Sequence, residues 1–222
     1  MTMARKRVAI LISGRGSNMT ALIEAAADPD FPAEIALVLS NRADAGGLAR
    51  AAEAGIATAV IDHRAYGSRA EFDAAMDARL RAEAIDLVCL AGFMRLLTDG
   101  FVEGWRDRMI NIHPSLLPLF PGLHTHERAI EAGMRLHGCT VHFVRAQMDS
   151  GPIIGQAAVP IALDDTPDTL SKRVLTAEHQ LYPLALALVA SGLASVEHER
   201  LVMQGDLPAD LAGMLVSPRF GG

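Results

Sequence analysis

Residues 8–18 of the chain read VAILISGRGSN, and this stretch decides the fold. Residues 8–13 form an apolar run without alternation, which is typical of a strand that is covered on both faces. A turn with Gly14 and Gly16 follows, and a helix is predicted from about Asn18 to Ala27. A buried strand, a glycine turn and a helix in this order predict the first unit of a parallel sheet.

The alternation of strands and helices continues along the chain. Short runs rich in β-branched residues predict further strands at 35–41, 56–61, 86–93 and 109–113. Helices are predicted between them at 46–54 and 69–84, the second with Ser68 as its N-cap. The first half of the chain is therefore expected to form a parallel sheet with helices on both faces.

The second half has a different pattern. A proline-rich stretch at 114–121 excludes a regular helix or a central strand. The elements predicted after it are a short helix at 127–133, strands at 139–145 and 152–161, a helix at 168–191, and one strand from 196 before a tail. The loop 146–151 is short, which favours antiparallel pairing of the strands that it joins.

We therefore predict an α/β fold with a doubly wound, mostly parallel sheet that has an antiparallel edge. The chain shows no internal repeat, linker or low-complexity tract, so one domain is expected. Residues 1–192 are expected to form its main part, and residues 193–222 a C-terminal strand and tail of the same domain.

Composition narrows the classes of function. The 222 residues are 50% hydrophobic and 21% charged, which allows a sizeable core and excludes a disordered chain. The net charge of −6 disfavours a general nucleic-acid binder. Cys89 and Cys139 form no CxxC pair, and no apolar stretch reaches the roughly 18 residues of a membrane span. A soluble, cytoplasmic protein without membrane or nucleic-acid partners is expected.

The glycine turn is the first candidate site. In Gly16-Ser17-Asn18 the backbone N–H groups at a helix N-terminus can hold a phosphate. Met19 stands where a dinucleotide fingerprint requires its third glycine, so that motif is absent. Plain capping of the helix by Ser17 or Asn18 explains the segment equally well.

Asn111 and His113, at the end of a predicted strand, form the second candidate site. Alternation along a strand places both side chains on one side and Ile110 and Ile112 on the other. An amide donor can stabilise an oxyanion, and an imidazole can move protons near neutral pH. A polar pair that merely ends the strand remains an alternative.

Asp149, in the loop before Gly151 and Pro152, is the third candidate. A carboxylate that reaches His113 would orient its ring and favour its protonated form. Local sequence alone favours an ordinary turn aspartate, just as it favours a solvated helix charge for Glu178. His142 alternates with apolar Val141 and Phe143, so it either faces the same cleft or packs in the core. His124 and His126 lack the spacing of a metal site, so no metal is expected.

The chain resembles the folate-dependent glycinamide ribonucleotide formyltransferases of purine biosynthesis. AGFMRLL at 91–97, NIHPSLLP at 111–118 and PGLHTH at 121–126 occur in the order that this family shows, and in combination they are specific. Shorter matches lie at 14–18, 40–45 and 149–152, and the resemblance covers residues 8–192. Leu119 and Arg15 depart from residues frequent in the family. The known fold of the family agrees with the sheet predicted above.

The resemblance implies transfer of a formyl group from 10-formyltetrahydrofolate, a co-substrate, to the amine of glycinamide ribonucleotide. Asn111 and His113 would stabilise the tetrahedral intermediate, and His113 would also donate a proton. Asp149 would favour protonated His113 and help to pass protons through water. These three are the expected catalytic residues.

The resemblance also implies two sets of binding residues. The ribonucleotide would contact Gly16, Ser17, Asn18 and Glu178. The folate would contact Arg69, Met94, Arg95, Leu96, Leu97, Asn111, Arg145, Ala146, Gln147 and Met148. Monomer and homodimer both remain open.

The sequence fits two related activities and a binding role less well. Methionyl-tRNA formyltransferase would need an added RNA-binding domain, for which the chain is short and acidic. Formyltetrahydrofolate hydrolase would need a domain ahead of the first strand. A binding module without catalysis would not need Asn111, His113 and Asp149 together.

Overall fold

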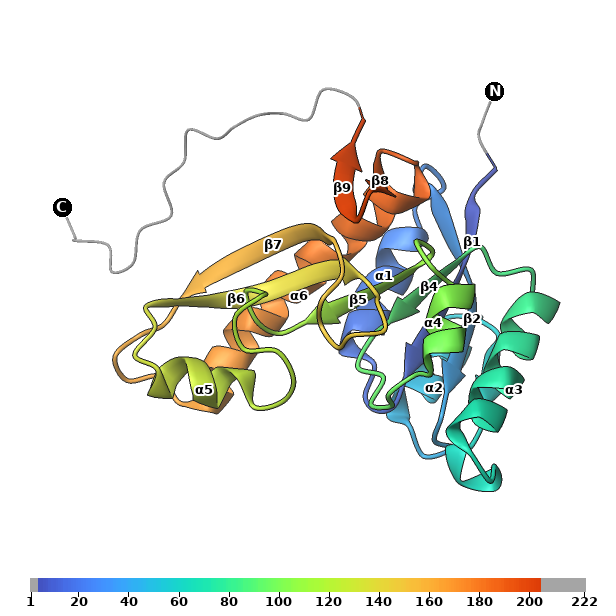
Figure 1. Cartoon of the computed structure of the whole chain (residues 1–222), viewed down its shortest axis with the longest axis horizontal. Helices are drawn as coiled ribbons and strands as arrows, with labels where there is room; N and C mark the ends of the chain where they lie inside the picture. The colour runs from blue at the N-terminus through green and yellow to red at the C-terminus, as the bar shows by residue number, and fades with distance from the viewer. Residues whose placement is uncertain (1–3, 205–222) are drawn as a thin grey trace.

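The computed structural model describes residues 4–204, whose main feature is one seven-stranded sheet (Figure 1). The strand order is β3-β2-β1-β4-β5-β6-β7. The strands are β1 (Lys6–Ile12), β2 (Ala33–Ser40), β3 (Thr58–Val60), β4 (Leu87–Leu90), β5 (Met109–His113), β6 (Leu136–Phe143) and β7 (Ile153–Pro160).

The first five strands run parallel to one another, and β6 runs in the opposite direction. β1 pairs with β2 and β4, β2 with β3, and β4 with β5, all in parallel. β6 then runs antiparallel to both β5 and β7. The predicted doubly wound sheet with an antiparallel edge is confirmed. Its order reverses between β1 and β4, where sheets of this kind leave a crevice at the carboxyl ends of the strands.

Helices cover both faces of the sheet (Figure 1). They are α1 (Ser17–Ala26), α2 (Gly46–Glu53), α3 (Arg69–Ala82), α4 (Asp99–Gly104), α5 (Thr125–Glu131) and α6 (Pro167–Ala190), with a 3-10 turn at His63–Ala65. Alternate residues of β1 pack on opposite faces of the sheet. Val8, Ile10 and Ile12 pack in one hydrophobic cluster with α1 and α6. Ala9 and Leu11 pack in a second cluster with α3 and α4. This double burial is why β1 is an uninterrupted apolar run.

The long helix α6 is tied to the centre of the sheet by Tyr182. This side chain is fully buried, and its hydroxyl donates to the carbonyl of Leu90 at 3.0 Å and lies 3.2 Å from that of Ile110. These carbonyls belong to β4 and β5, so one hydroxyl joins the helix to two neighbouring parallel strands.

Several predicted boundaries were wrong. β3 and β4 are shorter than expected, and helix α4 was missed because its six residues are too few to show a helical period. The single strand expected from Val196 is a hairpin of β8 (Ala194–Glu197) and β9 (Arg200–Met203). The predicted tail after it lies outside the described residues. Within residues 4–204, every helix is too short or too polar to cross a membrane.

Replacing Tyr182 by Phe will lower the free energy of unfolding by about 1–2 kcal/mol, because the buried carbonyls of Leu90 and Ile110 lose a donor. Urea unfolding followed by circular dichroism measures this loss. Tyr66→Phe, at a half-buried position, is the matched control and should leave the midpoint unchanged. Equal midpoints for the two variants would contradict the role given to the Tyr182 hydroxyl.

Candidate active site

The end of β5 carries the two polar side chains predicted for the site. Ile110 and Ile112 are buried in the core cluster beside α6, so Asn111 and His113 point to the opposite side, as expected. The register with β6 places Asn111 opposite His142 and His113 opposite Thr140. Antiparallel pairing therefore adds a second row of polar side chains next to the first.

His113 is held between two acceptors. Its Nδ1 lies 3.5 Å from Oδ2 of Asp149, and its Nε2 lies 3.0 Å from the carbonyl oxygen of Phe120. The side chain is only 7% exposed. Only a doubly protonated imidazole offers an N–H group to both neighbours.

Asp149 lies in the loop between β6 and β7, which returns over the end of β5. Its backbone is left-handed, with φ of 52°, a conformation that aspartate adopts more readily than most residues. The same Oδ2 that faces His113 accepts the N–H of Gly122 at 2.8 Å. Asp149 is therefore more than the turn aspartate that local sequence favours. An amide, an imidazole and a carboxylate now stand together, and such a group can stabilise an oxyanion and move a proton.

His142, for which local sequence left both the cleft and packing open, lies at the site. Its Nδ1 lies 2.9 Å from the carbonyl of Phe143, and its Nε2 lies 3.2 Å from Nδ2 of Asn111. A carbonyl can only accept, so Nδ1 carries the proton and Nε2 accepts from the Asn111 amide. Burial lowers the pKa of His142, in keeping with a neutral ring. The signal that could have identified His142 is the antiparallel register of β5 and β6.

The glycine turn after β1 leads into α1 without a side-chain cap. Gly16 has φ of 72°, and a Cβ there would lie 3.1 Å from Cα of Gly47. In the part of the chain that the structure describes, no side chain caps the start of α1, so capping by Ser17 or Asn18, the simpler alternative, was wrong. Uncapped N–H groups at a helix N-terminus attract an anion, and the phosphate cradle stays a prediction for this turn.

Asn18 and Glu178 form a buried pair between α1 and α6. Nδ2 of Asn18 donates to Oε2 of Glu178 at 2.6 Å, and both residues are buried. Desolvation raises the pKa of Glu178 to about 6, against the opposing effect of the Asn18 hydrogen bond. Oδ1 of Asn18 is buried without a partner among the described residues. Glu178 is thus not the solvated helix charge that its local sequence suggests, and the pair offers polar groups for a ligand.

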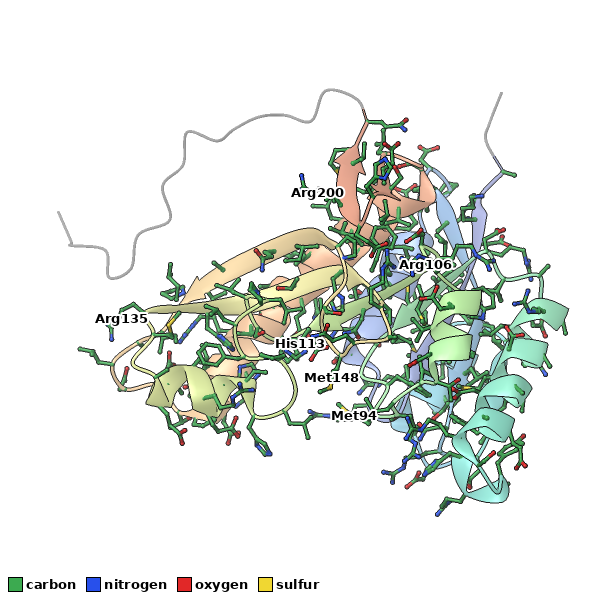
Figure 2. The ribbon with its side chains drawn as sticks, viewed as in Figure 1. Met94, Arg106, His113, Arg135, Met148 and Arg200 are labelled. Atoms are coloured by element: carbon green, nitrogen blue, oxygen red, sulfur yellow. The ribbon has the colours of Figure 1, made fainter. Side chains whose placement is uncertain are left out.

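The loop after β4 is fixed at one end and exposed at the other. The N–H of Met94 donates to the hydroxyl of Ser13 at 2.8 Å, and this hydroxyl donates to Oδ1 of Asn41 at 2.6 Å. The side chains of Met94 and Leu96 are exposed, as is that of Met148 in the Asp149 loop. Figure 2 shows Met148 and Met94 just below His113 in the view. Large exposed apolar side chains at such a rim suit a flat, apolar ligand.

The remaining predicted folate-binding residues differ in exposure and in their partners. Arg69 is the exposed first residue of α3, and Arg95, Ala146 and Gln147 are exposed in their loops. Leu97 is half-buried and packs against the α3 and α4 side of the core. Arg145 differs: its guanidinium binds Asp107 and Glu199, each at 2.7 Å, so the side chain is engaged within the protein. Among residues 4–204, no group of three His, Cys, Asp or Glu side chains is arranged to hold a metal ion.

Comparison with known proteins gives one consistent result. Residues 6–186 match the formyl transferase family. The chain is 54% identical over 190 residues to the trifunctional purine biosynthetic protein adenosine-3 of Gallus gallus, covering 86% of this chain but 19% of that protein. It is 43% identical over 198 residues to the phosphoribosylglycinamide formyltransferase of Escherichia coli (strain K12), covering 89% of this chain and 93% of the relative.

A solved structure extends the likeness to three dimensions. The crystal structure of phosphoribosylglycinamide formyltransferase from Brucella melitensis is similar with a TM-score of 0.82 and 57% sequence identity. The match covers 85% of this chain and 97% of that one. The chain thus spans a small part of the trifunctional relatives and nearly all of the single-function ones.

Glu178→Gln will change how stability depends on pH. Because folding raises the pKa of Glu178 from 4.5 to about 6, its contribution is fully present below pH 4.5 and is lost as pH rises through 6. The wild-type protein should lose roughly 2 kcal/mol relative to the variant between pH 4.5 and 7.5. Urea unfolding across this range tests the expectation, with the exposed Glu24→Gln on α1 as control. Parallel profiles for Glu178→Gln and wild type would contradict a buried carboxylate.

Proposed function

This chain belongs to the formyl transferase family, and from that premise we propose that it transfers the formyl group of 10-formyltetrahydrofolate to the amine of glycinamide ribonucleotide. The products are N-formylglycinamide ribonucleotide and tetrahydrofolate, in purine biosynthesis. The observation that carries the proposal is the grouping of Asn111, His113 and Asp149 at the end of β5. A protein that only bound these ligands would not need that grouping.

Asn111 serves the oxyanion in this proposal. The amine nitrogen of the ribonucleotide bonds to the formyl carbon, and negative charge develops on the formyl oxygen. Nδ2 of Asn111 has two N–H groups, of which His142 accepts one. The other remains for the developing oxyanion, and a donor fixed in advance stabilises it without reorganisation.

His113 and Asp149 supply the proton. The bond between the formyl carbon and the folate nitrogen breaks only if that nitrogen is protonated as it leaves, while the attacking amine must give up a proton. Protonated His113 is the donor, and the facing carboxylate of Asp149 stabilises its charge. Asp149 also accepts a proton through water from the attacking amine, so the overall proton count balances.

The ribonucleotide is assigned to the side of the site formed by α1 and α6. Gly16, Ser17 and Asn18 present backbone N–H groups to the phosphate. Glu178 accepts hydrogen bonds from the ribose hydroxyls, for which it is already desolvated and oriented by Asn18. This assignment explains why Glu178 is a buried carboxylate, which packing alone does not explain.

The folate is assigned to the opposite side, against the two exposed loops. The contacts proposed are Arg69, Met94, Arg95, Leu96, Leu97, Asn111 and residues 145–148. The apolar side chains of Met94, Leu96 and Met148 suit the flat ring system, and Arg69 suits the anionic glutamate end. Arg145 contributes through its backbone, since its guanidinium is bound elsewhere.

The broader setting is proposed on the same basis. We place the enzyme in the cytoplasm, acting on small molecules, with neither a metal nor nucleic acid, as a monomer or homodimer. We assign residues 1–192 to the main, catalytic part of one domain, and the β8–β9 hairpin to the same domain.

Mixing the purified protein with glycinamide ribonucleotide and a 10-formyl folate should consume the formyl donor and yield the formylated ribonucleotide, which absorbance and mass spectrometry measure. Omission of the ribonucleotide is the control and should stop the reaction. Equal loss of donor without acceptor would reveal a hydrolase, and no loss at all would refute the transferase assignment.

His113→Ala should lower kcat by about 100-fold or more, the usual contribution of a positioned acid. Ribonucleotide affinity should stay within several-fold, because His113 is assigned to the reacting atoms. Asp149→Asn, which keeps an acceptor for the Gly122 N–H, should lower kcat about tenfold or more through loss of charge. The exposed Asp30→Asn, far from the site in sequence, is the control for Asp149→Asn. A near-normal rate for His113→Ala would remove that residue from the mechanism.

A further inference from the structure

A group of five charged side chains connects the start of the Asp149 loop to the C-terminal hairpin. Arg145, two residues after β6 ends, donates from Nε to Glu199 and from Nη2 to Asp107, each at 2.7 Å. Its Nη1 donates to the carbonyl of Val144 at 3.0 Å. All three guanidinium nitrogens are engaged, and the side chain is only 10% exposed.

Glu199 is held from a second direction. Arg106, in the segment between α4 and β5, binds both Glu199 and Glu103. Figure 2 shows Arg106 between α4 and the β8–β9 hairpin. The Glu199 carboxylate thus joins two arginines from different parts of the chain, which makes a network rather than a single exposed pair.

The backbone at both acidic partners is unusual. His198 and Glu199 form the two-residue turn of the hairpin with φ of 50° and 59°, and Asp107 has φ of 58°. A turn with two positive φ angles favours Asn-Gly, and other residues there carry strain. A glutamate at this position places its carboxylate against Arg145 at the expense of backbone stability.

Arg145 lies at the start of the exposed segment 146–148, so its ion pairs hold that end of the segment. The base of the loop is closed by the N–H of Phe143, which donates to the carbonyl of Pro152 at 2.9 Å. From Arg145 the chain runs through exposed residues 146–148 to Asp149, which Gly122 and His113 hold. Arg145 is therefore the anchor on one side of the exposed segment and Asp149 the anchor on the other.

We propose that Glu199 and Asp107 are positioning residues, which act through Arg145 to set the segment 146–148 against the formyl donor. The inference rests on the proposed function, which assigns this segment to folate. It also replaces a direct folate contact by the Arg145 side chain with an indirect one. The C-terminal hairpin thereby takes part in the binding of the formyl donor without touching it.

The central experiment compares Glu199→Gln with Glu197→Gln in the full-length enzyme. Glu197 is an exposed carboxylate at the other end of the same turn. Glu199→Gln should raise KM for the formyl donor about three- to tenfold, the size of a coupling between adjoining elements. Its kcat should stay within about twofold and KM for the ribonucleotide should not change, while Glu197→Gln should match wild type.

A double-mutant cycle tests whether Glu199 acts through Arg145. Arg145→Met should raise KM for the donor, and adding Glu199→Gln to it should raise KM no further, because the interaction is already lost. Asp107→Asn keeps a residue that tolerates left-handed backbone and removes only the charge, so it supplies a second variant if Glu199→Gln fails to fold. Additive effects of Arg145→Met and Glu199→Gln would overturn the proposed route.

Hydrogen exchange separates this inference from the proposed function. The amides of Phe143 and Val144 donate to the carbonyls of Pro152 and Met109 at the base of the loop, and they should exchange faster in Glu199→Gln than in wild type. Amides of β1 and β4 should keep their rates. This readout needs no turnover, so it holds even if the wild-type enzyme fails to use the ribonucleotide. Unchanged exchange at Phe143 and Val144 together with an unchanged KM for the donor would overturn the inference and leave the transferase assignment intact.

Discussion

The antiparallel pairing of β5 with β6 is the constraint on which the rest of the site depends. It places His142 opposite Asn111, so that the imidazole orients the amide, and it sends the following loop back over the end of β5. β6 ends beside the start of β5, which places Arg145 next to Asp107, and the loop then folds back to bring Asp149 to His113. If β6 were parallel to β5, it would end beside His113 instead, and Arg145 would lie at the other end of the strand from Asp107.

Two features near the site are unfavourable for stability: a buried carboxylate and a strained turn. Glu178 lies within the protein interior with one direct partner, Asn18, and its raised pKa records the desolvation. Burial of this kind lowers stability unless a ligand or a hydrogen bond offsets it. The strained turn at Glu199 follows the same pattern, because local preference gives way where a side chain must reach a particular partner.

The elements of the fold were largely predictable, because apolar periodicity reports directly on burial. The run at 8–13, the Ser68 cap of α3 and the antiparallel pair before α6 all have local signals that the structure confirms. Two elements had no local signal. Helix α4 is too short to show a helical period, and the turn of the β8–β9 hairpin has His-Glu where Asn-Gly is typical. In the site, alternation correctly put Asn111 and His113 on one side, whereas the roles of His142 and Arg145 depended on partners far along the chain.

The sequence by itself determined the α/β class, the order of the elements and the strand ends at which polar side chains gather, because these follow from the local alternation of residues. Only the tertiary structure decided which of those side chains meet. Asn18 and Glu178 lie 160 positions apart, and Arg145 reaches Asp107 and Glu199 across separate elements. Such contacts are set by how helices and strands pack, and so are the burial and pKa values that depend on them.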